Sequence, residues 1–428
     1  MTTATDDAAA GLIAFIDASP SPFHACASAA ALLDAAGFTA LAETDPWPAD
    51  PGRHYLIRGG SLVAWDTGHG AGPATPFRVV AAHTDSPNLH LKPRPDLSRA
   101  GWQLVGVEVY GGPLLSTWLD RDLGLSGRLT LRCDRGITSR LVRLDEPWLR
   151  VSNLAVHLNR GVNTEGLVLN PQQHLAPHWG LGDTPGDILG QLTAALDVDP
   201  GDVLAWDLMT HDLTPARRTG ADRATIAAPR LDNQTTAYAA TRALIEAGVP
   251  STPHHQVVVL FDHEEVGSIS ERGAGSALLS ATLERLVLAA GGGREDLLRA
   301  LAGTVIISGD AAHATHPNYA DKHEPQHPVA MNGGPVLKLN AQLRYATDGV
   351  GVGQATLAAE RAGVPLQRFV TRTDLPCGST VGPLISAATG ATTVDVGTPT
   401  LSMHSARELA GAADQAMYVD LLTAFLTP

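Results

Sequence analysis

The sequence predicts an α/β fold, with a mostly parallel sheet covered by helices on both faces and interrupted by an inserted β-rich domain. Two observations support this prediction. Apolar strand-like segments occur before residue 90 and alternate with helical segments after residue 228, as parallel strands joined by helices do. Between about residues 90 and 225, short alternating strands are separated by Gly and Pro, and helical periodicity is scarce. We therefore expect a discontinuous α/β domain at 1–90 and 226–428, with a β-rich domain for assembly at 91–225.

Composition excludes several classes of protein. The chain has 428 residues, enough for two or three domains, and its formal net charge of −14 argues against a nucleic-acid partner. No apolar run approaches the roughly 20 residues that span a bilayer, and the N-terminus is acidic where a secretory signal is basic. The three cysteines form no CxxC pair. We expect a soluble cytoplasmic protein with no membrane partner.

The N-terminal part reads as helices followed by strands. The opening stretch is helical, and a second helix near residues 22–37 has Ser21 as a candidate cap and Pro22 in its first turn. Strands are expected within 54–68 and 77–85, the second as a buried apolar run that ends in polar residues.

After residue 228, helices and strands alternate. The expected helices lie at 233–248, 275–290, near 353–362, near 379–388 and from about Ala406 to Phe425. The expected strands lie at 257–261, 304–308, 336–340, 366–371 and 392–396.

Polar residues follow several of these strands, at the sheet edge where open α/β sheets bind ligands. His83 and Asp85 follow the strand at 77–82, Glu264 and Glu265 follow 257–261, and Asp310 follows 304–308. Two further candidates lie elsewhere, Asp232 at the start of a helix and His404 before the last one. Each residue alone is weak evidence, because an Asp before a helix is more often an N-cap than a ligand, and adjacent glutamates are usually solvated.

Together these residues indicate a site for two metal ions. Imidazole and carboxylate ligands suit Zn, Mn or Co. A two-metal site needs a carboxylate shared by both ions, ligands for each ion and a separate carboxylate as base. Five candidate ligands are His83, Asp232, Glu265, Asp310 and His404. Glu264 then remains as the base, and Asp85 is spaced to hold the His83 imidazole.

The chain resembles the aspartyl aminopeptidases, two-metal peptidases of the cocatalytic zinc class. The shared motifs occur in the family's order along nearly the whole chain: HTDSP at 83–87, LDNQ at 231–234, DHEEVGS at 262–268, SGDAAHATHPNY at 308–319, PCGST at 376–380 and LSMHS at 401–405. The region 90–225 matches least distinctly.

The resemblance implies a role for each residue of the metal site. His83 and Asp310 would bind one ion, Glu265 and His404 the other, and Asp232 would bridge them. Glu264 would be the general base that takes a proton from the attacking water. Two divalent ions per subunit are implied, with zinc expected and manganese or cobalt fitting the same ligands.

The resemblance also implies the substrate and further site residues. The family prefers peptides with an N-terminal Asp or Glu, and Lys338 matches the lysine expected to pair with that side chain. Without the resemblance, Lys338 could equally be an edge-strand lysine whose ammonium reaches solvent. His313 is a further candidate for the substrate pocket, and the turn at Gly378 and Ser379 is expected near the substrate amine.

Assembly is implied by the family alone. Its members form homo-oligomers, so we expect a tetrahedral dodecamer in which a histidine from a neighbouring subunit stabilises the oxyanion. His157 resembles that histidine, whereas by itself it would be a surface or packing residue.

Other functions compete with an aminopeptidase for acidic residues. A broader aminopeptidase or an amide deacylase would keep the metal site and change the substrate. A non-catalytic assembly protein could lose Glu264 or one of the metal ligands, yet Glu264 and all five candidate ligands are present in this sequence. A serine hydrolase is disfavoured because no GxSxG elbow occurs.

Overall fold

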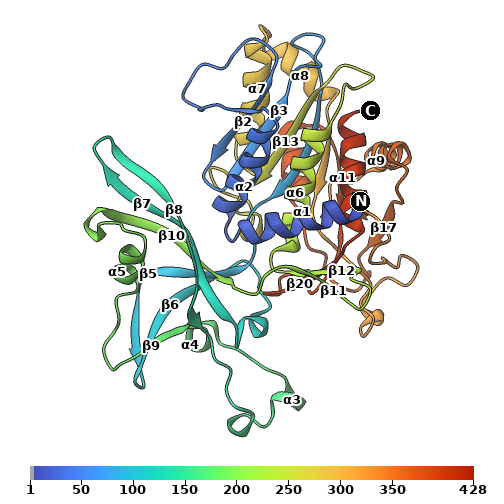
Figure 1. Ribbon diagram of the computed structural model, residues 1–428. Helices are drawn as coiled ribbons and strands as arrows, with labels where there is room; N and C mark the ends of the chain where they lie inside the picture. The colour runs from blue at the N-terminus through green and yellow to red at the C-terminus, as the bar shows by residue number, and fades with distance from the viewer. Residues whose placement is uncertain (1–3) are drawn as a thin grey trace. The chain divides into compact units, whose positions relative to one another are not determined.

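The computed structural model describes residues 4–428, which divide into two compact units. Of the described residues, the first unit comprises 4–85, Ala216–Met403 and Glu408–Pro428. The second comprises Ser86–Pro215 and His404–Arg407, and Figure 1 draws most of it in cyan and green. The β-rich insertion expected from the sequence is therefore present as a unit of its own, and a four-residue segment near the C-terminus joins it.

A nine-stranded sheet forms the centre of the first unit (Figure 1). Its strand order is β1-β2-β3-β13-β4-β14-β18-β16-β17, and neighbours are parallel except at β2–β3, β3–β13 and β16–β18. This confirms the mostly parallel sheet. The strands are β1 (Thr39–Ala40), β2 (Arg53–Arg58), β3 (Ser61–Asp66), β4 (Phe77–His83), β13 (His255–Phe261), β14 (Val305–Gly309), β16 (Val336–Leu339), β17 (Gln367–Val370) and β18 (Thr392–Gly397).

Helices cover both faces of this sheet because its central strands are apolar on both sides. Alternate residues of one strand enter different cores: Val258 and Leu260 face one, while Val257 and Val259 face the other. The first core is built on α1 (Ala4–Ala18), α2 (Pro22–Ala35), α6 (Leu231–Glu246), α9 (Gly349–Ala362) and α11 (Asp414–Leu426). The second is built on α7 (Leu278–Ala289), α8 (Arg294–Ala302) and α10 (Gly382–Thr389).

The local signals near the N-terminus are confirmed. Ser21 caps α2 by accepting a hydrogen bond from the His24 amide at 3.4 Å, and Pro22 is its first residue. The segment expected as a strand within 54–68 is a hairpin of two strands, β2 and β3, that turns at Gly59 and Gly60.

The last helix begins later than predicted. We expected it from about Ala406, but α11 begins at Asp414. The residues between include β20 (Glu408–Gly411), which pairs with β12 (Thr225–Ala228) and β19 (Pro399–Leu401). Sheet pairing therefore overrides the helical preference of this alanine-rich stretch. The same small sheet contains β11 (Arg217–Thr219) and β15 (Ala312–His313).

The second unit is a closed antiparallel barrel in the order β10-β5-β6-β9-β8-β7. Closure pairs every strand and leaves no exposed edge. Its core includes Leu89, Val105, Leu123 and Leu129, none of which is exposed. The elements are β5 (Asn88–Arg99), β6 (Trp102–Tyr110), β7 (Asp122–Cys133), β8 (Gly136–Arg150), β9 (His178–Leu181), β10 (Val203–Asp212), α3 (Val162–Glu165), α4 (Pro171–His174) and α5 (Ile188–Ala195).

Within residues 4–428, the structure contains no helix with the length and apolar character that crossing a bilayer requires.

Candidate metal centre

Four of the predicted metal ligands lie together in the first unit. Ligand atoms of His83, Asp232 and Glu265 lie within 4.8 Å of one another. His83 Nε2 lies 3.4 Å from Asp232 Oδ1 and 3.8 Å from Asp310 Oδ2. His83 is 1% exposed, so the cluster forms inside the protein.

The sheet order explains why these residues meet. β13, β4 and β14 are adjacent parallel strands, and His83 ends β4 while Asp310 follows β14. Glu264 and Glu265 lie in the 3₁₀ helix η4 (Glu264–Val266), shortly after β13. The carboxyl ends of β13, β4 and β14 therefore reach one edge of the sheet, as the sequence predicted. Asp232 comes from the start of α6, and its peptide bond to Asn233 is cis.

Asp85 links the ends of β4 and β13. Its two carboxylate oxygens accept hydrogen bonds from the amides of Glu264 and Glu265, each at 3.1 Å. Its backbone carbonyl lies 3.0 Å from His83 Nδ1, and its Oδ1 lies 3.4 Å from the same nitrogen. Asp85 thus contacts the imidazole, as expected, and it also holds the backbone of both glutamates, which the sequence did not indicate.

An ion pair between the buried Asp262 and the half-buried Arg272, not expected from the sequence, supports the same loop. Arg272 Nε donates to Asp262 Oδ2 at 2.7 Å, and the Arg272 guanidinium also contacts His263 Nε2 at 3.1 Å. Asp262 is 1% exposed. The loop needs this support because His263 and Ser268 both have left-handed backbone conformations, with φ of 66° and 63°.

Asp310, one of the four clustered residues, forms an ion pair with Lys338. Lys338 Nζ donates to Asp310 Oδ1 at 3.1 Å and to the Ala311 carbonyl at 3.2 Å, and it lies 4.9 Å from the centre of the Tyr345 ring. Close packing sets the backbone here, because a Cβ on Gly397 would lie 1.7 Å from the Asp310 carbonyl oxygen.

Lys338 is not an edge-strand lysine. It lies on β16, between β17 and β18, and is 2% exposed. The alternative in which its ammonium reaches solvent is therefore wrong. An ammonium buried in this way requires a nearby anion, and Asp310 is that partner.

Asp395 organises the loops around Lys338, although the sequence did not single it out. It lies opposite Lys338 in the β16–β18 register and is fully buried. Its carboxylate accepts hydrogen bonds from Ser308 Oγ at 2.7 Å, Thr380 Oγ1 at 2.5 Å and the Ala346 amide at 2.6 Å. The only sequence signal was an acidic residue within a buried apolar strand.

The remaining substrate-pocket candidates are more exposed. His313 lies on β15, with its ring centre 5.8 Å from that of Phe369. Gly378 and Ser379 are exposed, and Ser379 Oγ donates to the Arg344 carbonyl at 3.0 Å.

His404 and His157 belong to the second unit. His404 Nδ1 lies 3.0 Å from the Gly112 carbonyl, and its backbone φ is 67°. His157 is exposed on the 3₁₀ helix η2 (Val156–Leu158). Leu154, Val156 and Leu158 beside it are 56%, 49% and 75% exposed.

The electrostatics of the cluster favour bound positive charge. Burial raises the pKa of Glu264 to about 8; the His83 charge opposes this rise, and the Asp310, Asp85 and Asp232 carboxylates add to it. Burial also raises the pKa of Asp310, which Lys338 partly offsets. Burial lowers the pKa of His83, but its hydrogen bonds to Asp232 and Asp85 outweigh burial and hold the pKa well above its ordinary value.

These residues fit a divalent cation site. Imidazole and carboxylate donors suit zinc, manganese and cobalt. Burying several carboxylates together costs free energy, which a cation among them offsets. His83, Asp232, Glu265 and Asp310 can therefore hold a metal ion.

We predict that Asp85→Ala weakens metal binding by about 10- to 100-fold, because Asp85 contacts the His83 imidazole and holds the Glu265 amide, and so orients two ligands. The measurement is the zinc dissociation constant by competition with a chelator. Asp348→Ala is the matched control, since Asp348 caps α9 through the Gly351 amide at 2.8 Å and lies outside the cluster. Equal zinc affinity in the Asp85→Ala variant and wild type would contradict the role of Asp85.

Comparison with known proteins gives a consistent result. The family model described as "Aminopeptidase I zinc metalloprotease (M18)" matches residues 15–426. A relative from Mycobacterium leprae, "Probable M18 family aminopeptidase 2", is 54% identical over 424 residues, which is 98% of each chain. A relative from Streptomyces coelicolor with the same name is 51% identical and covers 99% of this chain and 98% of its own.

Solved structures agree over the whole chain. A chain in the "Cryo-EM structure of the Ape4 and Nbr1 complex" has a TM-score of 0.93 and 34% identity, and the match covers 99% of this chain and 86% of that one. The "Structure of S. cerevesiae mApe1 dodecamer" has a TM-score of 0.84 and 29% identity, covering 98% of this chain and 96% of that one. The match to the family model over nearly the full length, together with the buried cluster, shows that this chain belongs to the M18 family of zinc aminopeptidases.

Proposed function

We propose that this M18 aminopeptidase removes an N-terminal Asp or Glu from peptides, with Glu264 as the general base. The observation that carries the proposal is the cluster of His83, Asp232, Glu265 and Asp310, with Glu264 beside it and the buried cation Lys338 bonded to Asp310. The cluster supports hydrolysis, and the lysine supports acidic specificity.

Two divalent ions would be held by five side chains. In our assignment, His83 and Asp310 hold one ion, Glu265 and His404 hold the other, and Asp232 is shared. Zinc is the expected metal, and manganese or cobalt would fit the same donors. Divalent ions in such a site lower the pKa of water and polarise the scissile carbonyl.

Glu264 is the carboxylate of the cluster that is not assigned to a metal ion, and it would transfer protons in the reaction. Its amide is held by Asp85, so its side chain begins from a fixed backbone position. Without metal ions, burial and the neighbouring carboxylates would keep it protonated near pH 7, since together they raise its pKa to about 8. Nearby divalent charge lowers a carboxylate pKa, so Glu264 would be ionised in the loaded enzyme. Its carboxylate then accepts the water proton and returns it to the nitrogen of the leaving amine.

Lys338 supplies the charge for acidic specificity in this proposal. Its ammonium is buried and is bonded to Asp310, which supplies part of its counter-charge. If Asp310 binds a metal ion, part of that counter-charge is withdrawn. An acidic side chain of the substrate would restore it, whereas an apolar one would leave a buried ammonium poorly paired. The nearby residues His313, Gly378 and Ser379 would contact the rest of the peptide terminus.

Self-association would complete the active site. A relative in this family forms a dodecamer, and we propose the same tetrahedral assembly here. The exposed apolar residues Leu154, Val156 and Leu158 form a surface of the kind that interfaces bury. His157 lies among them and would stabilise the oxyanion in a neighbouring subunit.

Two related functions use the same cluster. A broader aminopeptidase would not distinguish acidic from apolar N-terminal residues, and an amide deacylase would cleave N-acyl amino acids instead of peptides. Lys338 favours the acidic specificity over the first.

The proposed function predicts chelator-sensitive cleavage of peptides with N-terminal Asp or Glu in preference to Leu, Lys or Ala. The measurement is kcat/KM for the five matched peptides and for N-acyl amino acids, before chelation, after it and after zinc, manganese or cobalt is restored. Preference for Leu or Lys would overturn the acidic specificity, and cleavage only of N-acyl amino acids would identify a deacylase.

We predict that Glu264→Gln lowers kcat by about 10²- to 10⁴-fold while metal content stays near two ions per subunit, because the amide cannot accept the water proton. Steady-state kinetics and elemental analysis of one preparation give both values. Glu360→Gln, an exposed change on α9, is the control. Near-normal turnover in Glu264→Gln would exclude Glu264 as the base.

We predict that Lys338→Met reduces the ratio of kcat/KM for Asp over Leu peptides by at least about 30-fold, the low end of the cost of breaking a buried charge pair. The ratio separates a change in specificity from damage to Asp310, since damage to the metal site lowers kcat/KM for both peptides alike. Lys322→Met, an exposed lysine, is the control. A ratio unchanged from wild type would leave Lys338 with a structural role only.

A further inference from the structure

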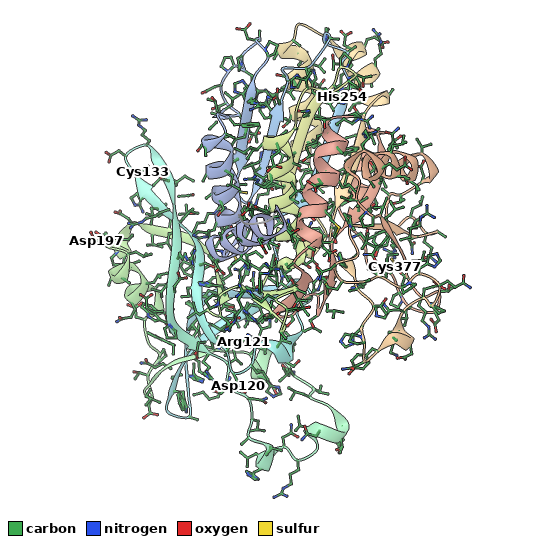
Figure 2. The ribbon with its side chains drawn as sticks, turned by 45° about the vertical axis from the view of Figure 1, so that its right-hand side comes forward. Asp120, Arg121, Cys133, Asp197, His254 and Cys377 are labelled. Carbon is green, nitrogen blue, oxygen red and sulfur yellow. The ribbon has the colours of Figure 1, made fainter. Side chains whose placement is uncertain are left out.

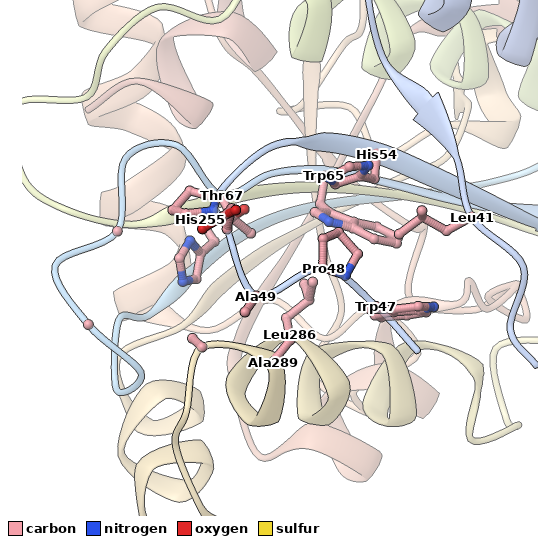
Figure 3. A pocket seen from close by; sticks show the side chains of 15 residues that line it. Leu41, Trp47, Pro48, Ala49, His54, Trp65, Thr67, His255, Leu286 and Ala289 are labelled. Carbon is pink, nitrogen blue, oxygen red and sulfur yellow. The ribbon is translucent and has the colours of Figure 1, made fainter. Parts of the chain in front are cut away.

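A cavity of about 230 Å³ lies at the other end of β13, away from the metal cluster. Figure 3 shows it between the sheet and α7, with Leu286 of that helix pointing toward Pro48 and with Trp65 and Trp47 to one side. The segment 41–51 closes one side, with Trp47 and Pro48 among the lining residues. All of these residues belong to the first unit.

His255 gives this cavity a polar group without a protein partner. It is the first residue of β13, is 7% exposed and lines the cavity beside Thr67 (Figure 3). Its Nδ1 is buried and has no hydrogen-bond partner among residues 4–428. Leaving a buried polar atom unpaired costs free energy, so a bound molecule that pairs with this nitrogen would recover it.

The imidazole is neutral at pH 7. Burial lowers the pKa of His255 to about 4, and the adjacent His254 contributes in the same direction. A neutral imidazole has one nitrogen that donates and one that accepts a hydrogen bond. It therefore favours an uncharged partner with an N–H or O–H group over an anion.

The aromatic wall of the cavity is already fixed in place. Trp65 is 1% exposed, and its ring centre lies 5.0 Å from that of Trp47. The Arg285 guanidinium lies 3.8 Å from the centre of the Trp47 ring and donates to the carbonyls of Glu43 and Asp45, each at 2.6 Å. A preformed wall lowers the entropy lost on binding.

We propose that this cavity is a second ligand site, which binds a flat, uncharged, two-ring heteroaromatic molecule through a hydrogen bond to His255 and apolar contacts with Trp47, Trp65 and Leu286. The size agrees, because a cavity of about 150 Å³ lined by apolar side chains holds one benzene ring. The cavity here is larger.

This site is separate from the metal centre. β13 carries His255 at its first residue and Phe261 at its last, before the loop with Glu264. Six steps of roughly 3.3 Å along a strand place the two ends about 20 Å apart. Binding at His255 therefore does not depend on the proposed catalytic roles.

The test is calorimetric titration of the metal-loaded enzyme with indole, which has one N–H donor, and with indene, its isostere without that group. We expect indole to bind with a dissociation constant on the order of a millimolar or below. Indene should bind about tenfold more weakly, the effect of one lost hydrogen bond. Removing the metals with a chelator should leave indole affinity unchanged, which separates this site from the metal centre.

Three variants identify the site. His255→Phe removes the ring nitrogens and should abolish the preference for indole over indene. Ala289→Phe fills the cavity from α7 and should abolish binding of both. Leu288→Phe is the control, because Leu288 is the preceding residue of α7, is 54% exposed and does not line the cavity; it should bind indole as wild type does.

Ala289→Phe also keeps the test decisive if His255→Phe fails to fold, because residue 289 is only half-buried. The proposal is overturned if wild type binds no indole up to its solubility limit, if indole and indene bind equally, or if Ala289→Phe binds indole as wild type does.

Discussion

The metal centre depends on the hydrogen bonds that join the ends of β4 and β13. The Thr84 amide donates to the Phe261 carbonyl at 2.8 Å, and the Asp85 carboxylate accepts from the Glu264 and Glu265 amides. One dipeptide therefore positions the backbone of both glutamates relative to His83. The Asp262–Arg272 pair supports the same loop from its other side. All of these bonds are made within the protein.

Burial of like charges is the cost of this arrangement. Several carboxylates lie close together in a largely buried site, and the raised pKa values of Glu264 and Asp310 express that cost. Lys338 offsets part of it through Asp310, and divalent ions would offset more. In the proposed function, Lys338 would connect the metal site with substrate choice, because its ammonium is bonded to Asp310 and would also pair with an acidic substrate side chain.

The two ends of β13 have different chemistry. The carboxyl end leads to charged groups that need cations, whereas the amino end opens on tryptophan rings and the histidines His54 and His255. The apolar strand residues between them, Val257 to Leu260, are almost fully buried and pack against helices on both faces. Metal binding and the proposed aromatic site can therefore be tested separately in the same molecule.

The sequence by itself determined the fold class, most of the strands and which polar residues gather at the sheet edge. Apolar runs in β4, β13 and β14 end in His83, Glu264 with Glu265, and Asp310, and parallel strands bring such ends to one edge. Local signals of this kind depend on residues that are near one another in the chain.

The tertiary structure decided what depends on distant partners. The start of α11 at Asp414 follows from the pairing of β20 with β12, about 180 residues earlier. The Lys338–Asp310 bond, the Asp395 hydrogen bonds and the cavity at His255 each join segments far apart in sequence. No local periodicity encodes such contacts, because they arise only when separate strands and loops pack against one another.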